Sequence, residues 1–348
     1  MPKFYPIRTK KINMKPTQFL RATVLFTGMV VMFACNKNSV NNGGAGSDNA
    51  TDLATQADDQ AQVSNEDAAV SDDVNTVLYS DPTIAGTRSL SPASATTAVN
   101  TITQVNGAQG PILNLICDAS VVINKDSAIK TITITYNGNN CWGNRTRTGV
   151  VVITIPAGVH WEDQGAVVTV NIQNLVITRL RDNKSITING NKTITNVTGG
   201  LLKNLASLGT ITHTITGELS VDFENNTNRS WNVSKQRVFT YDNGIVITTT
   251  GTHSDNDGHN NVAEWGVNRK GEDFESLISE PKIIRQDCDF RLTIGENTVL
   301  RSDGVSIVID YGLDANGNPT SCPGTGVYYM KVVVTKANGI ILTKILPY

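Results

Sequence analysis

The chain has almost no net charge and none of the common catalytic motifs, and these absences exclude several classes of protein. Its 29 Lys and Arg residues are balanced by 31 Asp and Glu residues, so the formal charge is -2 and there is no basic footprint for nucleic acid. There is no Gly-x-Ser-x-Gly elbow, phosphate-binding loop or His-Glu-x-x-His segment. The sequence therefore predicts a protein that is not an enzyme and has no nucleic-acid partner.

Long hydrophobic runs are also missing. No apolar run approaches the ~20 residues that a membrane-spanning helix needs, and the longest, Ala22–Ala34, is too short to cross a bilayer as a folded helix. Basic residues precede this run, and Cys35 and a polar stretch follow it. This order is typical of a secretory signal peptide, which we place at 1–35, with either Met1 or Met14 as the start.

The end of the signal, Met-Phe-Ala-Cys, resembles a bacterial lipobox, in which the cysteine is lipidated and becomes the mature N-terminus. The resemblance implies that Cys35 carries lipid, including palmitate, and anchors the protein in the outer membrane. The residues after Cys35 are Asn-Lys-Asn, without the acidic run associated with surface export, so we favour the periplasmic side over surface display. The alternative is a signal peptide that is cleaved elsewhere.

Residues 36–105 are rich in Asn, Ser, Asp, Ala, Gly and Thr and have few large apolar side chains. Such a segment buries too little surface to offset its ordering entropy, so we predict a low-complexity tether. One short helix is expected at 64–79, because Ser64 and Asp67 have capping-box spacing and Val70, Val74, Val77 and Leu78 share a face.

From about 106 to 348 the apolar residues alternate with polar ones, as in Thr131–Tyr136 and Val305–Tyr311. Asn-Gly and Asp-Gly pairs separate many of these runs and favour tight hairpins. They include Asn106-Gly107, Asn137-Gly138, Asn189-Gly190, Asn243-Gly244 and Asp303-Gly304. Strands with one polar face form antiparallel sheets. We therefore predict an all-β domain over 106–348, an antiparallel, hairpin-rich β-sandwich or partly closed barrel.

Once Cys35 is assigned to lipid, four cysteines remain: Cys117, Cys141, Cys288 and Cys322. Four cysteines allow three disulfide connectivities, and an exported protein favours disulfides over metal binding. Two stretches share a layout, in which one cysteine precedes an alternating strand that ends in Tyr and another follows it. This layout suggests two related halves and favours the pairs Cys117–Cys141 and Cys288–Cys322, one in each half; the alternative is coincidence among similar strands.

The segment KTITITYN followed by CWGNRTRTGVVVIT (130–154) resembles a block in uncharacterised all-β lipoproteins of Bacteroidota. That block contains an alternating strand, a cysteine and a Gly-x-Arg-x-Arg-x-Gly segment, which Gly143, Arg145, Arg147 and Gly149 match. The later EWGVNRKG (264–271), Cys288, DYG (310–312) and Cys322 are similar to the C-terminal part of the family. The resemblance implies a cell-envelope location and an all-β fold, and it supplies no catalytic residues.

The segment His253–Glu264 provides the strongest candidate for a cofactor, a Ca²⁺ ion. Counted as a twelve-residue calcium loop, it places Asp255, Asp257 and Glu264 at ligand positions and Gly258 at the turn. The alternative is an Asp-Gly turn in a polar hairpin. His253 and His259 form a second candidate pair, for a transition metal, and His213 is expected to be a packed strand residue.

Trp142, Arg145 and Arg147 are candidate ligand-binding residues, because the two arginines flank a turn near the tryptophan and suit an anion. The four tryptophans, Trp142, Trp161, Trp231 and Trp265, could stack on sugar rings, although aromatic residues make up only 6% of the chain; packing in the core is the alternative.

Together these features predict a lipid-anchored β protein of the outer membrane that acts as a binding or structural module. Its expected partners are the membrane, through the N-terminal lipid, and a glycan or an envelope protein. The alternatives are a carbohydrate-binding or carbohydrate-active lipoprotein that uses the tryptophans, and a lipid carrier. The carrier would require a sheet that curves around an apolar cavity.

Overall fold

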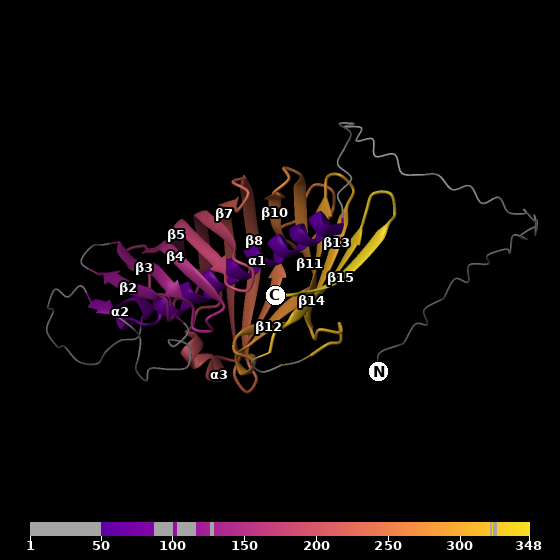
Figure 1. The fold of residues 1–348 in the computed structure, drawn as a ribbon. Helices are drawn as coiled ribbons and strands as arrows, with labels where there is room; N and C mark the ends of the chain where they lie inside the picture. Colours follow the sequence, from indigo (N-terminus) through magenta and orange to yellow (C-terminus); the bar gives the residue numbers. More distant parts are fainter. Residues whose placement is uncertain (1–49, 87–99, 103–115, 126–128, 321, 323–325) are drawn as a thin grey trace, which may run out of the picture. The chain divides into compact units, whose positions relative to one another are not determined.

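The computed structural model describes residues 50–86, 100–102, 116–125, 129–320, 322 and 326–348 (Figure 1), with only the backbone described at 100–102. The predicted signal peptide, Cys35 and residues 36–49 lie outside this part of the chain, as does the Asn106-Gly107 pair. Among the helices in the described ranges, none is long and apolar enough to cross a membrane.

Fifteen strands in the described ranges form one antiparallel sheet, which confirms the predicted all-β fold. Neighbouring strands follow chain order almost throughout, except that β9 pairs with β8 and β11 beside β10. The strands are β1 (Asn100–Ile102), β2 (Ala119–Asn124), β3 (Lys130–Asn139), β4 (Arg145–Ile155), β5 (Ala166–Arg179), β6 (Lys184–Asn196), β7 (Thr210–Phe223), β8 (Asn228–Tyr241), β9 (Ile245–Gly251), β10 (Val262–Val267), β11 (Asp273–Arg285), β12 (Arg291–Arg301), β13 (Ser306–Leu313), β14 (Tyr329–Thr335) and β15 (Ile341–Pro347).

Several predicted hairpin turns lie between strands as expected, for example Asn243-Gly244 between β8 and β9 and Asp303-Gly304 between β12 and β13. Two others were assigned wrongly, because Asn137-Gly138 lies within β3 and Asn189-Gly190 within β6. A Cβ atom on Gly190 would lie 2.3 Å from the carbonyl oxygen of Glu218 on β7. Glycine is therefore needed at this position because two strand backbones approach closely, and not because the chain turns.

The helix α1 (Ala50–Leu78) lies inside the curve of the sheet and crosses its strands (Figure 1). Twenty of its 29 residues are buried, including nine in succession from Gln56 to Ser64. Nine residues make two and a half helical turns, so the helix is buried on all sides. Its C-terminal end lies near β3 and β4, and its N-terminal end near β12 and β14.

This helix differs from the predicted tether over 36–105 and from the short helix expected at 64–79. Because the sequence of α1 is polar, its composition predicted that it would not pack against the β domain. In the structure, its acidic side chains form ion pairs with basic side chains of the sheet. The backbone of β1 also falls within the predicted tether. The middle of that segment is therefore part of the domain, whereas 36–49, 87–99 and 103–105 lie outside the described residues.

Three short helical turns complete the described part of the chain: α2 (Pro82–Ala85), η2 (Leu202–Asn204) followed by α3 (Leu205–Leu208), and η3 (Gln286–Cys288). Asp81 caps α2 by accepting a hydrogen bond of 2.8 Å from the Thr83 amide. The amide of Trp161 donates to the carbonyl oxygen of Ile84 at 2.8 Å. The bond from Trp161 joins the end of the helical segment to the loop between β4 and β5.

One main apolar core joins α1 to strands from both ends of the sheet, including Val63, Val70, Ile134, Ile309 and Met330. A smaller cluster forms beneath η2 and α3 around Leu205 and Phe239. Of the two predicted arrangements, a two-sheet sandwich is wrong, because the helix and not a second sheet covers the inner face.

The two disulfides join Cys117 to Cys141 and Cys288 to Cys322, with Cα–Cα distances of 5.1 and 5.3 Å. This is the pairing that the repeated layout favoured. In both cases the linked cysteines enclose two consecutive hairpin strands, β2 with β3 and β12 with β13.

We expect that replacing Cys117 and Cys141 with serine lowers the free energy of unfolding by about 3.5 kcal/mol, because it opens a loop in the unfolded chain. The cysteines are separated by 24 residues, and the 34-residue separation of Cys288 and Cys322 predicts a loss of similar size. Urea unfolding of both double variants measures the effect. Recovery of a Cys117–Cys322 or Cys117–Cys288 peptide from a non-reducing digest would show the pairing to be wrong.

Candidate functional site

The inner face of the sheet is strongly charged. The helix α1 has seven acidic residues and no basic ones, and every acidic residue forms an ion pair with the sheet or its loops. The basic partners are Arg145, Arg147, Arg179, Arg181, Lys184, Lys192, Lys235, Arg237, Arg269 and Lys270. These partners come from many strands, so the ion pairs fix both the position and the rotation of α1.

Asp67 lies at the centre of this interface. Its Oδ1 accepts a hydrogen bond of 2.5 Å from Lys192 Nζ, and its Oδ2 accepts one of 2.9 Å from Lys235 Nζ. Lys235 Nζ also contacts Glu264 Oε1 at 2.5 Å, and Lys192 Nζ donates to Ser71 Oγ at 2.6 Å. Burial raises the pKa of Asp67, but the two ammonium groups outweigh this effect and hold the pKa well below its usual range.

The arginines of the Gly-x-Arg-x-Arg-x-Gly segment bind α1, which corrects their predicted role at an external anion site. Arg147 is 2% exposed; its Nε and Nη2 donate to Asp118, both at 2.7 Å, and its Nη1 donates to Asp73 at 2.6 Å. Arg145 Nη1 donates to Glu66 at 2.8 Å. Trp142 is 45% exposed and does not share these contacts.

The predicted calcium loop does not form a single site. Glu264 is 0% exposed on the inner face, where its carboxylate accepts hydrogen bonds from Gln60 and Trp231. Asp257 is exposed at the tip of the loop between β9 and β10. Glu264 lies on β10 and points toward α1, whereas Asp255 and Asp257 lie in the loop that precedes this strand. The assignment of Glu264 as a partner of Asp255 and Asp257 is therefore wrong.

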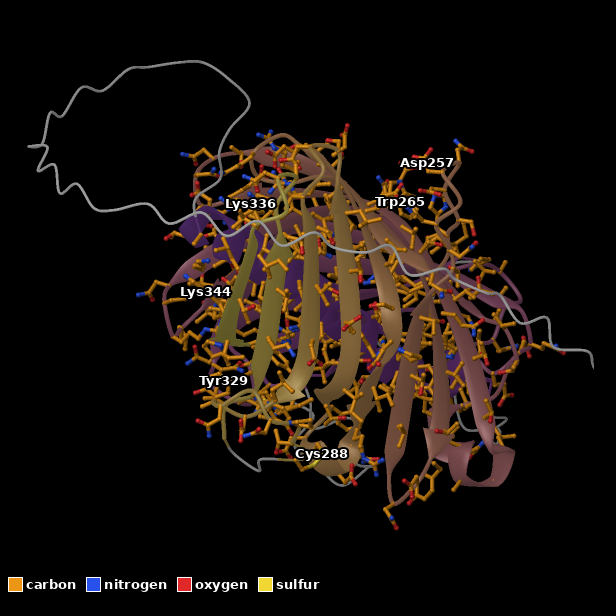
Figure 2. The ribbon with its side chains drawn as sticks, turned by 90° about the vertical axis from the view of Figure 1, so that its right-hand side faces the viewer. Asp257, Trp265, Cys288, Tyr329, Lys336 and Lys344 are labelled. Carbon is orange, nitrogen blue, oxygen red and sulfur yellow. A yellow bond between two sulfur atoms is a disulfide. The ribbon has the colours of Figure 1, made fainter. Side chains whose placement is uncertain are left out.

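A different group of side chains converges on the opposite surface, where the loop before β10 meets paired residues of β10 and β11. We call it the outer-face cluster and define it as His253, Asp255, His259, Trp265 and Glu275. Trp265 and Glu275 are paired across β10 and β11, and His253 stacks on Trp265 with ring centroids 4.2 Å apart. Figure 2 shows Trp265 near Asp257, at the end of the molecule that carries this loop.

Three members of the cluster lie within hydrogen-bond distance. His259 Nδ1 is 2.6 Å from Asp255 Oδ2 and 3.1 Å from Glu275 Oε2. Burial raises the pKa of Asp255, but the hydrogen bonds from His259 and Glu275 outweigh it and lower the pKa to about 2. Hydrogen bonds to the two carboxylates raise the pKa of His259, and burial together with Asp255 raises that of Glu275.

The loop between β9 and β10 holds Asp255 in this orientation. Asp255 Oδ1 accepts hydrogen bonds from the backbone amides of Asp257 at 3.0 Å and His259 at 2.7 Å. Its other oxygen, Oδ2, is therefore directed toward His259 and Glu275. The sequence analysis identified Asp255 and His259 separately but missed Glu275, which lies on another strand.

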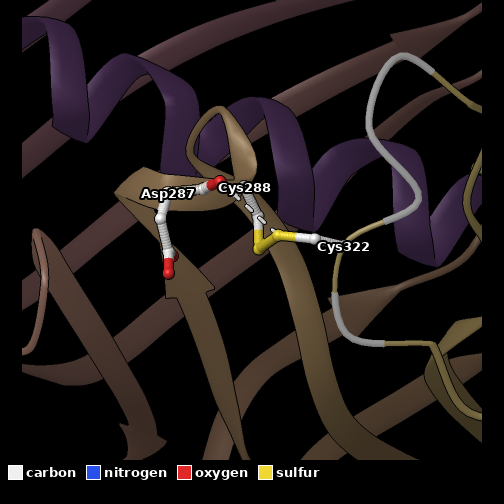
Figure 3. A group of neighbouring side chains, drawn as sticks. All are labelled: Asp287, Cys288 and Cys322. Carbon is white, nitrogen blue, oxygen red and sulfur yellow. Dashed lines mark hydrogen bonds between the residues drawn. A yellow bond between two sulfur atoms is a disulfide. The ribbon is translucent and has the colours of Figure 1, made fainter.

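A second set of metal-ligand residue types comprises Asp287 and Cys288 of η3 and Cys322 (Figure 3). Its two sulfur atoms are bonded to each other. No thiolate is left to bind a metal in the oxidised protein, so we assign this group a structural role.

The tryptophans do not form a common sugar-binding surface. Trp161 and Trp231 are buried in the core, Trp265 is half-buried and Trp142 is exposed. The predicted packing of His213 is confirmed, since this side chain is 1% exposed and lies between the rings of Trp161 and Phe239.

The helix leaves little space inside the sheet. A cavity beside Gln56, Asp59 and Trp231 has a volume of about 20 Å³. This is room for about one water molecule and not for a lipid. The expectation of a carrier with an apolar cavity therefore receives no support from the described interior.

Comparisons with protein-family models, with curated proteins and with solved structures find no match.

We expect Asp67→Asn to lower the free energy of unfolding by about 3–5 kcal/mol, because it leaves Lys192 and Lys235 buried without their main counter-charge. The matched control is Asp52→Asn, which removes an acidic residue of the same helix whose ion pair with Lys270 is partly exposed. The control should lose less than about 1 kcal/mol. Equal losses in the two variants, measured by urea unfolding, would contradict a specific role for the buried pair.

We expect the buried His213 to make the free energy of unfolding sensitive to acid. Burial, reinforced by nearby Arg237, lowers its pKa to about 3, whereas an unfolded histidine titrates near 6.5. The unfolded chain therefore gains the proton first, and stability falls as the pH drops from about 6.5 toward 3. His213→Phe should remove up to about 1.4 kcal/mol of this loss per pH unit. Parallel pH dependences of unfolding in the two proteins would refute this account.

Proposed function

We propose that this protein is a lipid-anchored module of the outer membrane that binds its partner on the outer surface of an internally filled β domain. The observation that carries this proposal is the position of α1, which fills the inner face of the sheet. A partner must then be bound from outside, where the outer-face cluster groups two histidines, two carboxylates and an aromatic ring.

The proposed anchor would hold the domain close to the membrane. Fifteen residues lead from Cys35 to the first residue of α1, which is fixed within the sheet. A chain of that length spans at most about 50 Å when fully extended. The resemblance of 130–154 to lipoproteins of Bacteroidota supports the same location, and the Asn-Lys-Asn sequence after Cys35 favours the periplasmic side.

A carbohydrate ligand is the second candidate, and the exposure of Trp142 at 45% favours it. An exposed indole ring offers an apolar face to a sugar. Trp161 and Trp231 are buried and do not contribute, so this alternative depends on Trp142 and Trp265 alone.

The anchor is tested by Cys35→Ser in cells that receive labelled palmitate. We expect the unaltered protein to incorporate the label and to partition into detergent, and the variant to do neither, because acylation requires the thiol. Ser39→Ala, four residues away, is the matched control and should behave like the unaltered protein. Labelling and partitioning that persist in Cys35→Ser would overturn the proposed anchor.

A further inference from the structure

The contacts of Asp255, His259 and Glu275 differ from those of the acidic residues in the interior. All seven carboxylates of α1 are paired with Lys or Arg. By contrast, Asp255 and Glu275 both form an ion pair with His259. A carboxylate oxygen of Asp255 also lies within 4.8 Å of one of Glu275. Two carboxylates that meet in this way repel each other unless a proton or a cation lies between them.

The three donor atoms have an arrangement that suits a metal ion. One ligand atom of each residue, Asp255, His259 and Glu275, lies within 4.8 Å of the other two. Bonds of 2.0–2.1 Å to a tetrahedral ion place neighbouring ligand atoms about 3.3 Å apart. The observed separations of 2.6 and 3.1 Å to His259 Nδ1 would need to increase only slightly when an ion replaces the shared proton.

The surroundings of these atoms also fit a bound ion. The backbone amides of Asp257 and His259 hold the Asp255 carboxylate from behind, which is the support that outer contacts give to metal ligands. His259 and Glu275 are partly exposed, with side-chain exposures of 39% and 30%, so water can complete the coordination. One imidazole nitrogen and two carboxylate oxygens favour a first-row transition metal over Ca²⁺, which prefers oxygen ligands alone.

We propose that Asp255, His259 and Glu275 bind a divalent first-row transition-metal ion, with Zn²⁺ bound more tightly than Mn²⁺ and Ca²⁺ bound weakest. The inference deepens the proposed function, since it names a ligand for the outer-face cluster. It also replaces the predicted calcium site, because it keeps Asp255 but exchanges Asp257 and Glu264 for His259 and Glu275.

The test is titration of Zn²⁺, Mn²⁺ and Ca²⁺ into the full-length Cys35→Ser protein with its disulfides oxidised. Calorimetry gives the affinity, and ¹⁵N spectra of the four imidazole groups identify the ligand. We expect saturable Zn²⁺ binding that shifts the His259 Nδ1 signal. Glu275→Gln and His259→Ala should each weaken binding at least about tenfold. Both substitutions change partly exposed side chains outside the core, so the fold is retained.

Two matched controls separate this site from adventitious binding. Asp257→Asn removes an exposed carboxylate from the same loop, and His160→Ala removes another histidine that lies beside a carboxylate, Asp163. Both should keep the affinity of the parent protein. Equal Zn²⁺ affinity in Glu275→Gln and the parent, or no saturable binding below about 1 mM, would leave only a hydrogen-bonded triad and overturn the proposal. Because the parent lacks Cys35, this result does not depend on whether the anchor exists.

Discussion

The ion pairs between α1 and the inner face of the sheet are the interaction on which the rest of this structure depends. A helix with seven acidic residues and no basic ones is buried on all sides only because lysines and arginines of the sheet neutralise it. Buried ion pairs add little net stability compared with apolar packing, because both charges lose water. All seven carboxylates are paired in the observed position of α1, and this favours a role in specificity, because a shifted helix would leave buried charges unpaired.

The position of the helix explains other features of the domain. Tyr136 donates a hydrogen bond of 2.8 Å to Asp73, and the Arg147 guanidinium lies 4.3 Å from the centre of the Tyr136 ring. Tyr136, the tyrosine that ends the alternating strand in the first copy of the repeated layout, is thus part of the contact with α1. Since the helix occupies the concave side of the sheet, the outer surface and its loops are the accessible part of the described domain.

The alternation of the strands and the repeated cysteine layout were sufficient to predict the β fold and the pairs Cys117–Cys141 and Cys288–Cys322. The burial of α1 was not predictable in the same way, because its stability comes from residues more than a hundred positions away, such as Lys192 and Lys235. One signal was present: seven acidic residues without a basic one indicate a helix whose counter-charges lie elsewhere. The same limitation affected the candidate site. Spacing grouped Asp255 with Glu264, whereas the pairing of β10 with β11 brings Asp255 and His259 to Glu275.

Native-state hydrogen exchange of residues 50–78, read by mass spectrometry, tests the central claim most directly. If α1 is enclosed by the sheet, its backbone amides should exchange as slowly as those of the central strands β7 and β8, because exchange requires opening of the whole domain. Complete exchange of this segment within seconds, while β7 and β8 stay protected, would show that it is a free tether and would contradict the account.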